Sequence, residues 1–329
     1  MSFPFRFVVY FFVLVVLLKD CKGGNSVKVL NFGSLNIDHT YYVDDFVQKG
    51  QTITAKSLAD FIGGKGLNQS ISLSRAGTEV YHIGAIGLDG EVLLKTLEDN
   101  AINTTYLQRL NALSGHTIIQ IDAGGDNSII VHGGTNRMLD EAFIDSVFQD
   151  FKDEKTVVLL QNEVSNVPYI IERAHADGHK IVLNPSPIDD ILLGSPLEFI
   201  DCFILNESEG FALTGEKDSK AILDKMQKLY PNAKVVLTLG EAGSIAMNQD
   251  DRIEQIAFKA EKVVDTTGAG DTFTGYFLNE VLNGGTYAIA LEKASMASSL
   301  SVGVDGAVNS IPTIQNVKEK LAEVKKSDK

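Results

Sequence analysis

The feature that most constrains the fold is a series of short apolar runs that each end in polar or glycine residues. Four of these runs are TVVLLQNE, KIVLNPSP, DCFILNESE and AKVVLTLGEAGS, which begin at residues 156, 180, 201 and 233. Between them lie amphipathic stretches such as VPYIIERAHADG, with apolar residues at helical spacing. Strands that are apolar along their whole length and alternate with helices predict a parallel sheet covered on both faces.

The polar residues at the ends of these runs indicate where a ligand would bind. A further run, VKVLNFGSLNID, begins at residue 27 and ends in Asn36, Ile37 and Asp38. Ligands of open parallel sheets gather at the carboxyl ends of the strands, where all these polar residues would lie. We therefore predict a Rossmann-like, three-layer α/β/α fold with a mostly parallel central sheet and a site at this edge.

Two regions depart from the alternation of strand and helix. Residues 38–64 and 115–134 alternate between apolar and polar positions and contain glycine turns, a pattern typical of half-exposed strands. They are too short for a second globular domain, so we expect a small β-sheet lid, from about 38–62 and 113–135, over the active edge. The flat outer face of such a sheet would suit pairing with a second copy, which predicts a homodimer.

Composition excludes some classes of protein. The chain has 329 residues, of which 44% are hydrophobic, enough to bury the core of one large domain. A net charge of −14 argues against a nucleic-acid-binding protein, which would show clusters of basic residues. The two cysteines, Cys21 and Cys202, cannot build a disulfide framework, and this is typical of a reducing compartment.

The N-terminus carries an apolar run at residues 7–18. It is too short to cross a bilayer and has the length of a signal-peptide core, but no small-x-small cleavage site follows it. Two glycosylation sequons, at Asn68 and Asn206, fall in the motifs described below, where a glycan would block a ligand. We therefore treat residues 1–26 as an extension of uncertain role and 27–329 as one domain, and expect a cytoplasmic protein without a stable membrane partner.

The stretch VVDTTGAGDTFTGYF, residues 263–277, joins a strand to a helix through a glycine turn. Gly268, Ala269 and Gly270 are small enough for several backbone N–H groups to converge, and such a turn at a helix N-terminus binds anions. Asp271 follows in the first turn of the helix, where an ordinary N-cap aspartate is the common alternative. An anion hole beside a carboxylate favours phosphoryl transfer, in which Asp271 would deprotonate an attacking hydroxyl.

A second glycine turn opens FIGGKGLNQSISLSRAG, residues 61–77. Taken singly, Lys65 could be a solvated loop residue and Asn68 an ordinary first-turn residue of a helix. Their occurrence together with Asn36, Asp38 and Glu163 near one edge of the sheet indicates a site for a polyhydroxylated ligand.

These motifs resemble those of the ribokinase-type sugar kinases in the PfkB carbohydrate-kinase family, from about residue 27 to the C-terminus. GGKGLNQ is similar to the first signature of the family and DTTGAGDTF to the second. NID and GGKGLNQ, together with Glu163, point to ribokinase over adenosine kinase, fructokinase or 1-phosphofructokinase. The resemblance implies ATP-dependent phosphorylation of D-ribose at its 5-hydroxyl. A kinase for another small sugar or nucleoside, with Tyr41 and Tyr42 against a base, and a catalytically silent sugar-binding protein are the alternatives.

The resemblance also implies a role for each matching position. Asp271 would be the catalytic base, and the turn from Gly268 to Asp271 would stabilise the transferred phosphoryl group. The sugar would be held by Asn36, Ile37, Asp38, Gly64, Lys65, Gly66, Asn68, Glu163 and Asp271. ATP would contact Asn206, Thr238, Gly240, Gly243, Gly270, Asp271 and Ser295, and Glu209 would help hold hydrated Mg²⁺. Ser295 departs from the Asn or His that is common near the adenine in this family, so the choice between ATP and GTP stays open.

Ribokinases also bind a monovalent cation, K⁺, beside the anion hole. The positions that match its ligands are Asp265, Thr267, Ser301, Val304, Gly306 and Ser310. Asp265 and Ser310 would use side-chain oxygens, whereas Ser301, Val304 and Gly306 would use backbone carbonyls. Oxygen ligands are those that a hard cation prefers.

Overall fold

The structure is a computed structural model that describes residues 27–248 and 251–327. The predicted N-terminal extension, with Cys21 and the apolar run at residues 7–18, lies outside the described residues. Across the described ranges, no helix combines the length and apolar character needed to cross a membrane.

A nine-stranded sheet forms the centre of the fold, in the order β13-β12-β11-β10-β9-β8-β1-β4-β5. All neighbouring strands are parallel except at one edge, where β11–β12 and β12–β13 are antiparallel. The four runs that predicted buried strands form β8 to β11, side by side. The strands are β1 (Val29–Phe32), β4 (Val80–Ile86), β5 (Leu107–Arg109), β8 (Val157–Leu160), β9 (Lys180–Leu183), β10 (Cys202–Asn206), β11 (Lys234–Thr238), β12 (Ser244–Asn248) and β13 (Asp251–Gln255).

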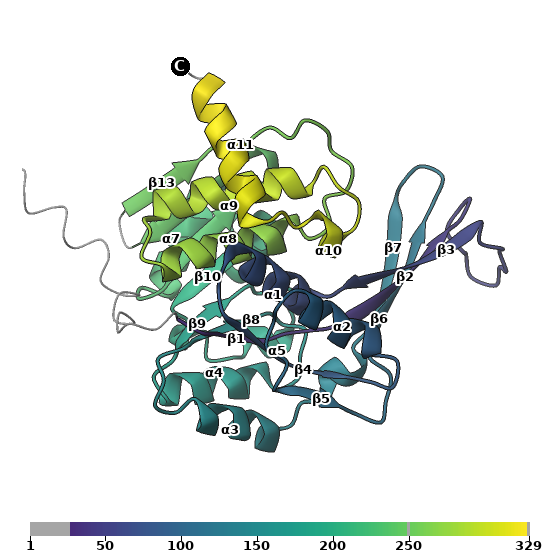
Figure 1. Cartoon of the computed structure of the whole chain (residues 1–329), viewed down its shortest axis with the longest axis horizontal. Helices are drawn as coiled ribbons and strands as arrows, with labels where there is room; N and C mark the ends of the chain where they lie inside the picture. Colours follow the sequence, from purple (N-terminus) through teal and green to yellow (C-terminus); the bar gives the residue numbers. More distant parts are fainter. Residues whose placement is uncertain (1–26, 249–250, 328–329) are drawn as a thin grey trace, which may run out of the picture.

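Helices cover both faces of this sheet (Figure 1). Since successive side chains of a strand point to opposite faces, each strand packs against both layers of helices. Val29 and Leu159 pack in a cluster with one group of helices, and Leu30 and Leu160 in a cluster with the other. The first group is α1 (Lys65–Ala76), α2 (Glu91–Asp99), α8 (Ala269–Leu282), α9 (Tyr287–Ser301) and α11 (Ile314–Ser327); the second includes α3 (Glu141–Asp150), α4 (Val167–Ala176) and α7 (Ser219–Leu229). Short helices are α5 (Asp190–Leu193), α6 (Glu207–Thr214) and α10 (Ala307–Ser310), with 3₁₀ turns η2 (Gly134–Arg137), η3 (Leu197–Phe199) and η4 (Gly240–Ala242). The predicted three-layer fold is confirmed.

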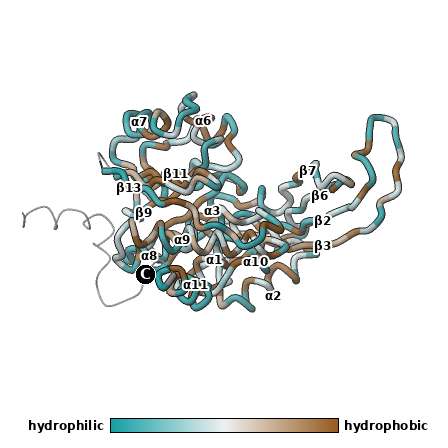
Figure 2. The backbone as a smooth tube through the Cα atoms, turned by 90° about the horizontal axis from the view of Figure 1, so that it is seen from above, coloured by the Kyte–Doolittle hydropathy of each residue, from teal (hydrophilic) through white to brown (hydrophobic). Residues whose placement is uncertain are grey.

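A separate four-stranded sheet projects from one end of the molecule (Figure 1). Its order is β3-β2-β6-β7, built from β2 (Asn36–Tyr42), β3 (Ser57–Gly63), β6 (Gly115–Ile121) and β7 (Asn127–His132). Figure 2 shows it extending well beyond the helices of the main body. The small sheet predicted from the alternating segments is therefore present, and we call it the lid sheet.

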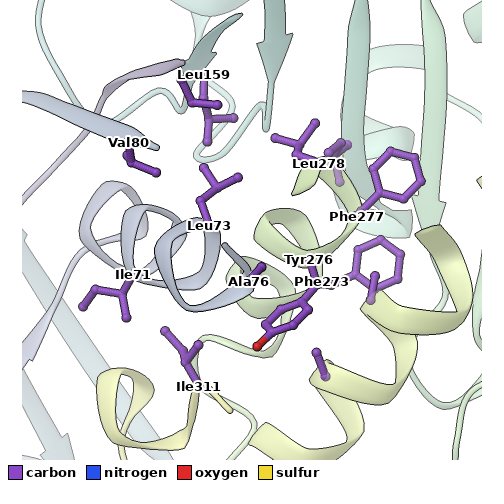
Figure 3. Packing of buried hydrophobic residues seen from close by; sticks show 14 of the residues in the cluster. Ile71, Leu73, Ala76, Val80, Leu159, Phe273, Tyr276, Phe277, Leu278 and Ile311 are labelled. Atoms are coloured by element: carbon purple, nitrogen blue, oxygen red, sulfur yellow. The ribbon is translucent and has the colours of Figure 1, made fainter. Parts of the chain in front are cut away.

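Helices α1 and α8 approach each other at backbone distance. A Cβ atom at Gly275 would collide with the Ser72 hydroxyl and lie 2.6 Å from the backbone nitrogen of Leu73. The Ser72 hydroxyl donates to the carbonyl of Thr272 at 2.8 Å. Figure 3 shows apolar side chains of the two helices meeting in one cluster, among them Leu73, Ala76 and Tyr276. The absence of a side chain at Gly275 thus sets how closely the two helices can pack.

His82 is fully buried in β4 between the sheet and α1. Its Nε2 lies 3.1 Å from the carbonyl oxygen of Gly33, and its Nδ1 lies 2.9 Å from the Ser70 hydroxyl. Burial lowers the pKa of His82 from 6.5 to about 4, although the hydrogen bond to Gly33 acts in the opposite direction. The ring is therefore neutral in the folded protein across the whole range in which it titrates in the unfolded chain.

Replacing Gly275 with Ala tests the contact between α1 and α8. We expect Gly275→Ala to lower the free energy of unfolding by about 1–3 kcal/mol, the usual cost of overpacking a core contact. Gly194→Ala is the matched control, since its Cβ would meet its nearest atom at 3.4 Å and its φ of −87° suits any residue. Urea denaturation measures both, and equal stabilities of the two variants would contradict the close approach.

The buried His82 predicts an acid-dependent loss of stability. Below pH 6.5 the unfolded chain binds a proton at this ring that the folded protein does not bind until about pH 4. The free energy of unfolding should therefore fall as the pH falls through this window, by up to about 1.4 kcal/mol per pH unit. Urea titrations at several pH values measure the slope, and His82→Gln should remove its share; the same slope in both proteins would refute this assignment.

Candidate active site

The centre of the site is Asp271, which is 5% exposed in the first turn of α8. Both of its carboxylate oxygens accept hydrogen bonds from α1. Oδ2 accepts from Nδ2 of Asn68 at 3.0 Å, and Oδ1 accepts from Nε2 of Gln69 at 2.9 Å. The two glycine turns predicted from the sequence are thus brought together, because each opens one of the two helices that pack at Gly275.

The turn before Asp271 has the geometry of an anion-binding loop. Gly268 has φ 73°, in the left-handed region where a side chain is strained, and it caps α8. The amides of Gly270 and Asp271 lie in the first turn, where no helical carbonyl precedes them. The amide of Ala269, also expected to face an anion, donates to the carbonyl of Thr266 at 3.3 Å. A Cβ at Gly270 would meet no atom within 4 Å, so this backbone borders open space.

Lys65 and Glu163 bring opposite charges to the same edge. Oε2 of Glu163, just beyond β8, accepts from the Ser34 hydroxyl and from the backbone N–H of Lys65, the latter at 3.1 Å. Burial raises the pKa of Glu163, although the Ser34 hydrogen bond and the charge of Lys65 oppose this. Burial alone would lower the pKa of Lys65, but the negative charges of Asp271, Glu163 and Glu209 outweigh it and raise that pKa. Lys65 is therefore held as a cation among three carboxylates.

The first residues of β2 contribute two of the expected sugar ligands. Oδ1 of Asp38 accepts from the Thr117 hydroxyl at 2.6 Å, and a Cβ at Gly63 would collide with its other oxygen. Burial raises the pKa of Asp38, with the Thr117 hydrogen bond acting against the shift. Oδ1 of Asn36 accepts from Nδ2 of Asn136 at 2.8 Å. Both side chains are fixed by neighbours before any ligand arrives.

Asn136, in η2, also pins the residue before Asn36. Its Oδ1 accepts from the N–H of Leu35 at 3.0 Å, and its Nδ2 donates to the carbonyl of Leu35 at 3.2 Å. Leu35 lies where the chain passes from β1 into the lid sheet. The Asn136 amide makes the two backbone hydrogen bonds with Leu35 that a neighbouring strand would otherwise make. A Cβ at Gly115 would collide with this amide, which explains the glycine at the start of β6.

Asn68 has an unused hydrogen-bond acceptor. Its side chain is 4% exposed, and Nδ2 donates to Asp271, but Oδ1 has no partner among the residues that the structure describes. A buried acceptor without a partner costs stability, so such groups usually serve a ligand or an ordered water. The position of this oxygen, beside Asp271, suits a ligand hydroxyl.

Gly64 and Gly66 allow the first turn of α1 to approach the end of β1. Gly64 has φ 100°, and its Cβ would lie 3.0 Å from the carbonyl oxygen of Ser34. A Cβ at Gly66 would collide with Gly33 and Ser34. Ile37 between the two polar residues of β2 is buried at 9% exposure and contributes to the core rather than to the polar set.

The residues expected at the nucleotide lie at the ends of β10 and β11. Asn206 and Thr238 are register partners in these two parallel strands. Asn206 and Glu209 form a capping box on α6: Oδ1 of Asn206 accepts from the N–H of Glu209 at 2.9 Å, and Oε2 of Glu209 accepts from the N–H of Asn206 at 3.0 Å. Gly240 and Gly243 both have positive φ in the η4 loop. Ser295 is buried in α9 at 6% exposure.

The residues expected to hold K⁺ come from two segments that Asp265 joins. Its Oδ1 accepts from the N–H of Thr267 at 2.8 Å and its Oδ2 from the N–H of Gly306 at 3.0 Å. Burial would raise the pKa of Asp265, but these hydrogen bonds lower it below its ordinary value. Ser301 and Ser310 are buried, and each hydroxyl donates to a nearby carbonyl, which leaves oxygen lone pairs to accept. Val304 is exposed on the loop between α9 and α10.

No three His, Cys, Asp or Glu side chains within residues 27–248 and 251–327 are grouped so that they could hold a metal ion. A monovalent cation at the Asp265 loop would instead rely on one carboxylate together with carbonyl and hydroxyl oxygens. These oxygens fit a hard cation. A Mg²⁺ site needs only one or two carboxylates from the protein, because substrate phosphates and water supply the other ligands.

Several residues of the site were not expected from the sequence. Gln69 and Gln161 are buried amides hydrogen-bonded to each other at 2.6 Å. Near the end of β1, Nδ2 of Asn31 donates to the carbonyl of Gly66, and the Ser34 hydroxyl oxygen accepts from the N–H of Gly66. Gln69 follows Asn68 and Gln161 lies two residues before Glu163, so proximity to expected ligands was the available signal.

Comparisons with known proteins identify the family of the chain. Residues 27–314 match the model of the pfkB family carbohydrate kinases. Ribokinase from Haemophilus influenzae is 31% identical over 297 residues, which covers 88% of this chain and 96% of that protein. Deoxyribokinase from Salmonella typhi is 30% identical over 303 residues, covering 88% and 97%. The structure of Arabidopsis thaliana ribokinase complexed with ribose and ATP superposes with a TM-score of 0.78 at 28% identity, covering 89% of this chain and 98% of that one. The chain therefore belongs to the PfkB family of carbohydrate kinases.

Proposed function

We propose that the chain is a ribokinase, which transfers the γ-phosphoryl group of ATP to the 5-hydroxyl of D-ribose and yields D-ribose 5-phosphate and ADP. The observation that carries the proposal is the buried Asp271, with both oxygens held by α1 beside the first-turn amides of α8. The relative named ribokinase and the plant ribokinase complexed with ribose and ATP support the choice of substrates.

The proposed reaction uses Asp271 as the general base. Asp271 takes the proton of the sugar 5-hydroxyl as that oxygen forms a bond to the γ-phosphorus, and the bond from the γ-phosphorus to the bridging oxygen breaks to release ADP. The amides of Gly270 and Asp271 donate to the charge that develops on the transferred group, with Gly268 providing the turn. Since the amide of Ala269 donates to Thr266, it joins only if that 3.3 Å contact is shared.

The remaining polar residues would hold the sugar and position its 5-hydroxyl. Asn36, Asp38 and Glu163 present oxygens to donors, and the unpaired Oδ1 of Asn68 would accept one sugar hydroxyl. Lys65 would donate from its ammonium group. Fixing a reactant in this way converts binding energy into rate, because the attacking oxygen no longer has to find its orientation.

Two cations complete the proposal. Mg²⁺ would neutralise the phosphate charge of ATP, held through water by Glu209 with Asn206 beside it. K⁺ would be held by Asp265, Thr267, Ser301, Val304, Gly306 and Ser310. Its role would be to order the loop that leads into the anion-binding turn, because Asp265 lies only three residues before Gly268.

We also propose that the protein forms a homodimer through the lid sheet and is cytoplasmic. Leu58 and Ile130 lie on one face of the lid sheet and Ile129 and Val131 on the other, and all four are more than half exposed. Exposed apolar side chains of this kind favour pairing of the lid sheet with a second copy. A cytoplasmic location is supported by Asn68, since its buried amide donates to Asp271 and a glycan on its sequon could not be accommodated.

A kinase for a different small sugar is the second candidate. Deoxyribokinase from Salmonella typhi is 30% identical to this chain and ribokinase from Haemophilus influenzae is 31% identical, yet the two are named for different sugars. A catalytically silent sugar-binding protein is disfavoured, because binding alone would not need a buried carboxylate next to an anion-binding turn.

Asp271→Asn tests the proposed base. Removing the proton acceptor while keeping the size of the side chain should lower kcat by about 10²- to 10⁴-fold, with D-ribose still bound in calorimetry. Asp99→Asn is the control, because Asp99 lies on α2 in an exposed ion pair with Lys95, and this variant should leave kcat unchanged. Retained turnover in Asp271→Asn would remove the base assignment.

A substrate panel with coupled detection of ADP tests the choice of sugar and the cation site together. D-ribose should give the highest kcat/KM, above 2-deoxy-D-ribose, fructose and nucleosides. Replacing K⁺ with tetramethylammonium should lower the rate, because that cation is too large to be held by the oxygen ligands of the two segments that Asp265 joins. A preference for another substrate would replace ribose in the proposal, and an unchanged rate without K⁺ would contradict the Asp265 site.

A further inference from the structure

A chain of buried polar side chains runs beneath the site from His82 to Asp271. Its intermediate members come from β1, α1 and the end of β8, and each is at most 1% exposed. In order from His82 they are Ser70, Asn31, Gln161 and Gln69. So many buried amides in contact are costly unless each donor meets an acceptor, which restricts the orientation of each amide.

The orientation is set at the His82 end by a backbone carbonyl. The Gly33 oxygen can only accept, so Nε2 of His82 carries the hydrogen and Nδ1 accepts from the Ser70 hydroxyl. The Ser70 oxygen then accepts from Nδ2 of Asn31 at 2.8 Å, and the second hydrogen of that amide goes to the carbonyl of Gly66 at 2.8 Å.

The amides between Asn31 and Asp271 are oriented by the same pairing of donors with acceptors. Oδ1 of Asn31 accepts from Nε2 of Gln161 at 3.1 Å, and the second hydrogen of Gln161 goes to Oε1 of Gln69 at 2.6 Å. Nε2 of Gln69 is therefore the group that faces Oδ1 of Asp271, at 2.9 Å, and Oδ1 of Asn184, at 3.1 Å. Turning over the amide of Gln161 would bring its oxygen against the oxygens of Asn31 and Gln69.

We propose that Gln69 is a positioning residue for Asp271 and that Gln161 acts behind it by keeping the Gln69 amide in the donating orientation. The inference rests on the proposed role of Asp271 as the base. Asn68 and Gln69 each hold one carboxylate oxygen, so together they fix the rotation of the carboxylate plane. A carboxylate has about four lone-pair sites, so both oxygens keep further capacity to accept a proton or hydrogen bond.

The steady-state kinetics of Gln69→Leu and Gln161→Leu test this role. Loss of the Gln69 donor should lower kcat by about 10- to 100-fold, the effect of a small misplacement of a catalytic group, with KM for D-ribose within about threefold of the wild-type value. The acid limb of the kcat–pH profile should move to higher pH, because the ionised carboxylate loses a donor while the charges of Lys65 and Glu163 that face it are unchanged.

The double variant distinguishes positioning from simple destabilisation. If Gln161 acts only through Gln69, then Gln69→Leu/Gln161→Leu should have the kcat of Gln69→Leu alone. Gln315→Leu, on the exposed face of α11, is the control for the substitution itself. Thermal unfolding verifies that each variant is folded; where Gln69→Leu is not, Gln69→Glu replaces it, since it keeps the size and the acceptor for Gln161.

Each outcome decides the proposal. A lowered kcat with a shifted acid limb and no further loss in the double variant supports it. An unchanged kcat and acid limb, or multiplicative losses in the double variant, overturns it and leaves these amides a structural role only. Retained turnover in Asp271→Asn would instead remove the proposed base, whatever the Gln69 variants do, so the two failures are separable.

Discussion

A carboxylate removed from water must receive hydrogen-bond donors, and Asp271 obtains them from a helix that begins far upstream in the chain. Asn68 and Gln69 supply these donors because α1 and α8 pack at backbone distance over Gly275. The same packing places the glycine turns of both helices side by side. The arrangement of the site therefore depends on a glycine with no contact to any proposed ligand.

The balance of charge at the site explains why cations belong in the proposed reaction. Lys65 lies among Asp271, Glu163 and Glu209, so negative charge exceeds positive charge before a nucleotide enters. ATP adds the charge of three phosphate groups. Without a divalent cation the phosphates and carboxylates would repel each other across a region of low dielectric, where such repulsion is stronger than in water.

Much of the fold follows from the sequence, because apolar runs and helical spacing record burial directly. The runs that became β8 to β11 and the alternating segments of the lid sheet were predicted on that basis. The hairpin of β12 and β13 was not, since its exposed, polar outer strand has no apolar run. Within the site, turns and carboxylates were predicted from their residue types. Gln69 and Gln161 were not, because the partner of an amide is decided by packing between elements, and sequence spacing does not contain it.

The attachment of the lid sheet to the main body has a mechanical consequence. Leu35 is bound through both its N–H and its carbonyl by the single side chain of Asn136, at the point where β1 passes into β2. The root of the lid is thus clamped, and Asn36 shares the clamp through its own side chain. Bending of the lid sheet at this root would have to break the hydrogen bonds to Asn136, so one side chain of the main body sets where β2 begins.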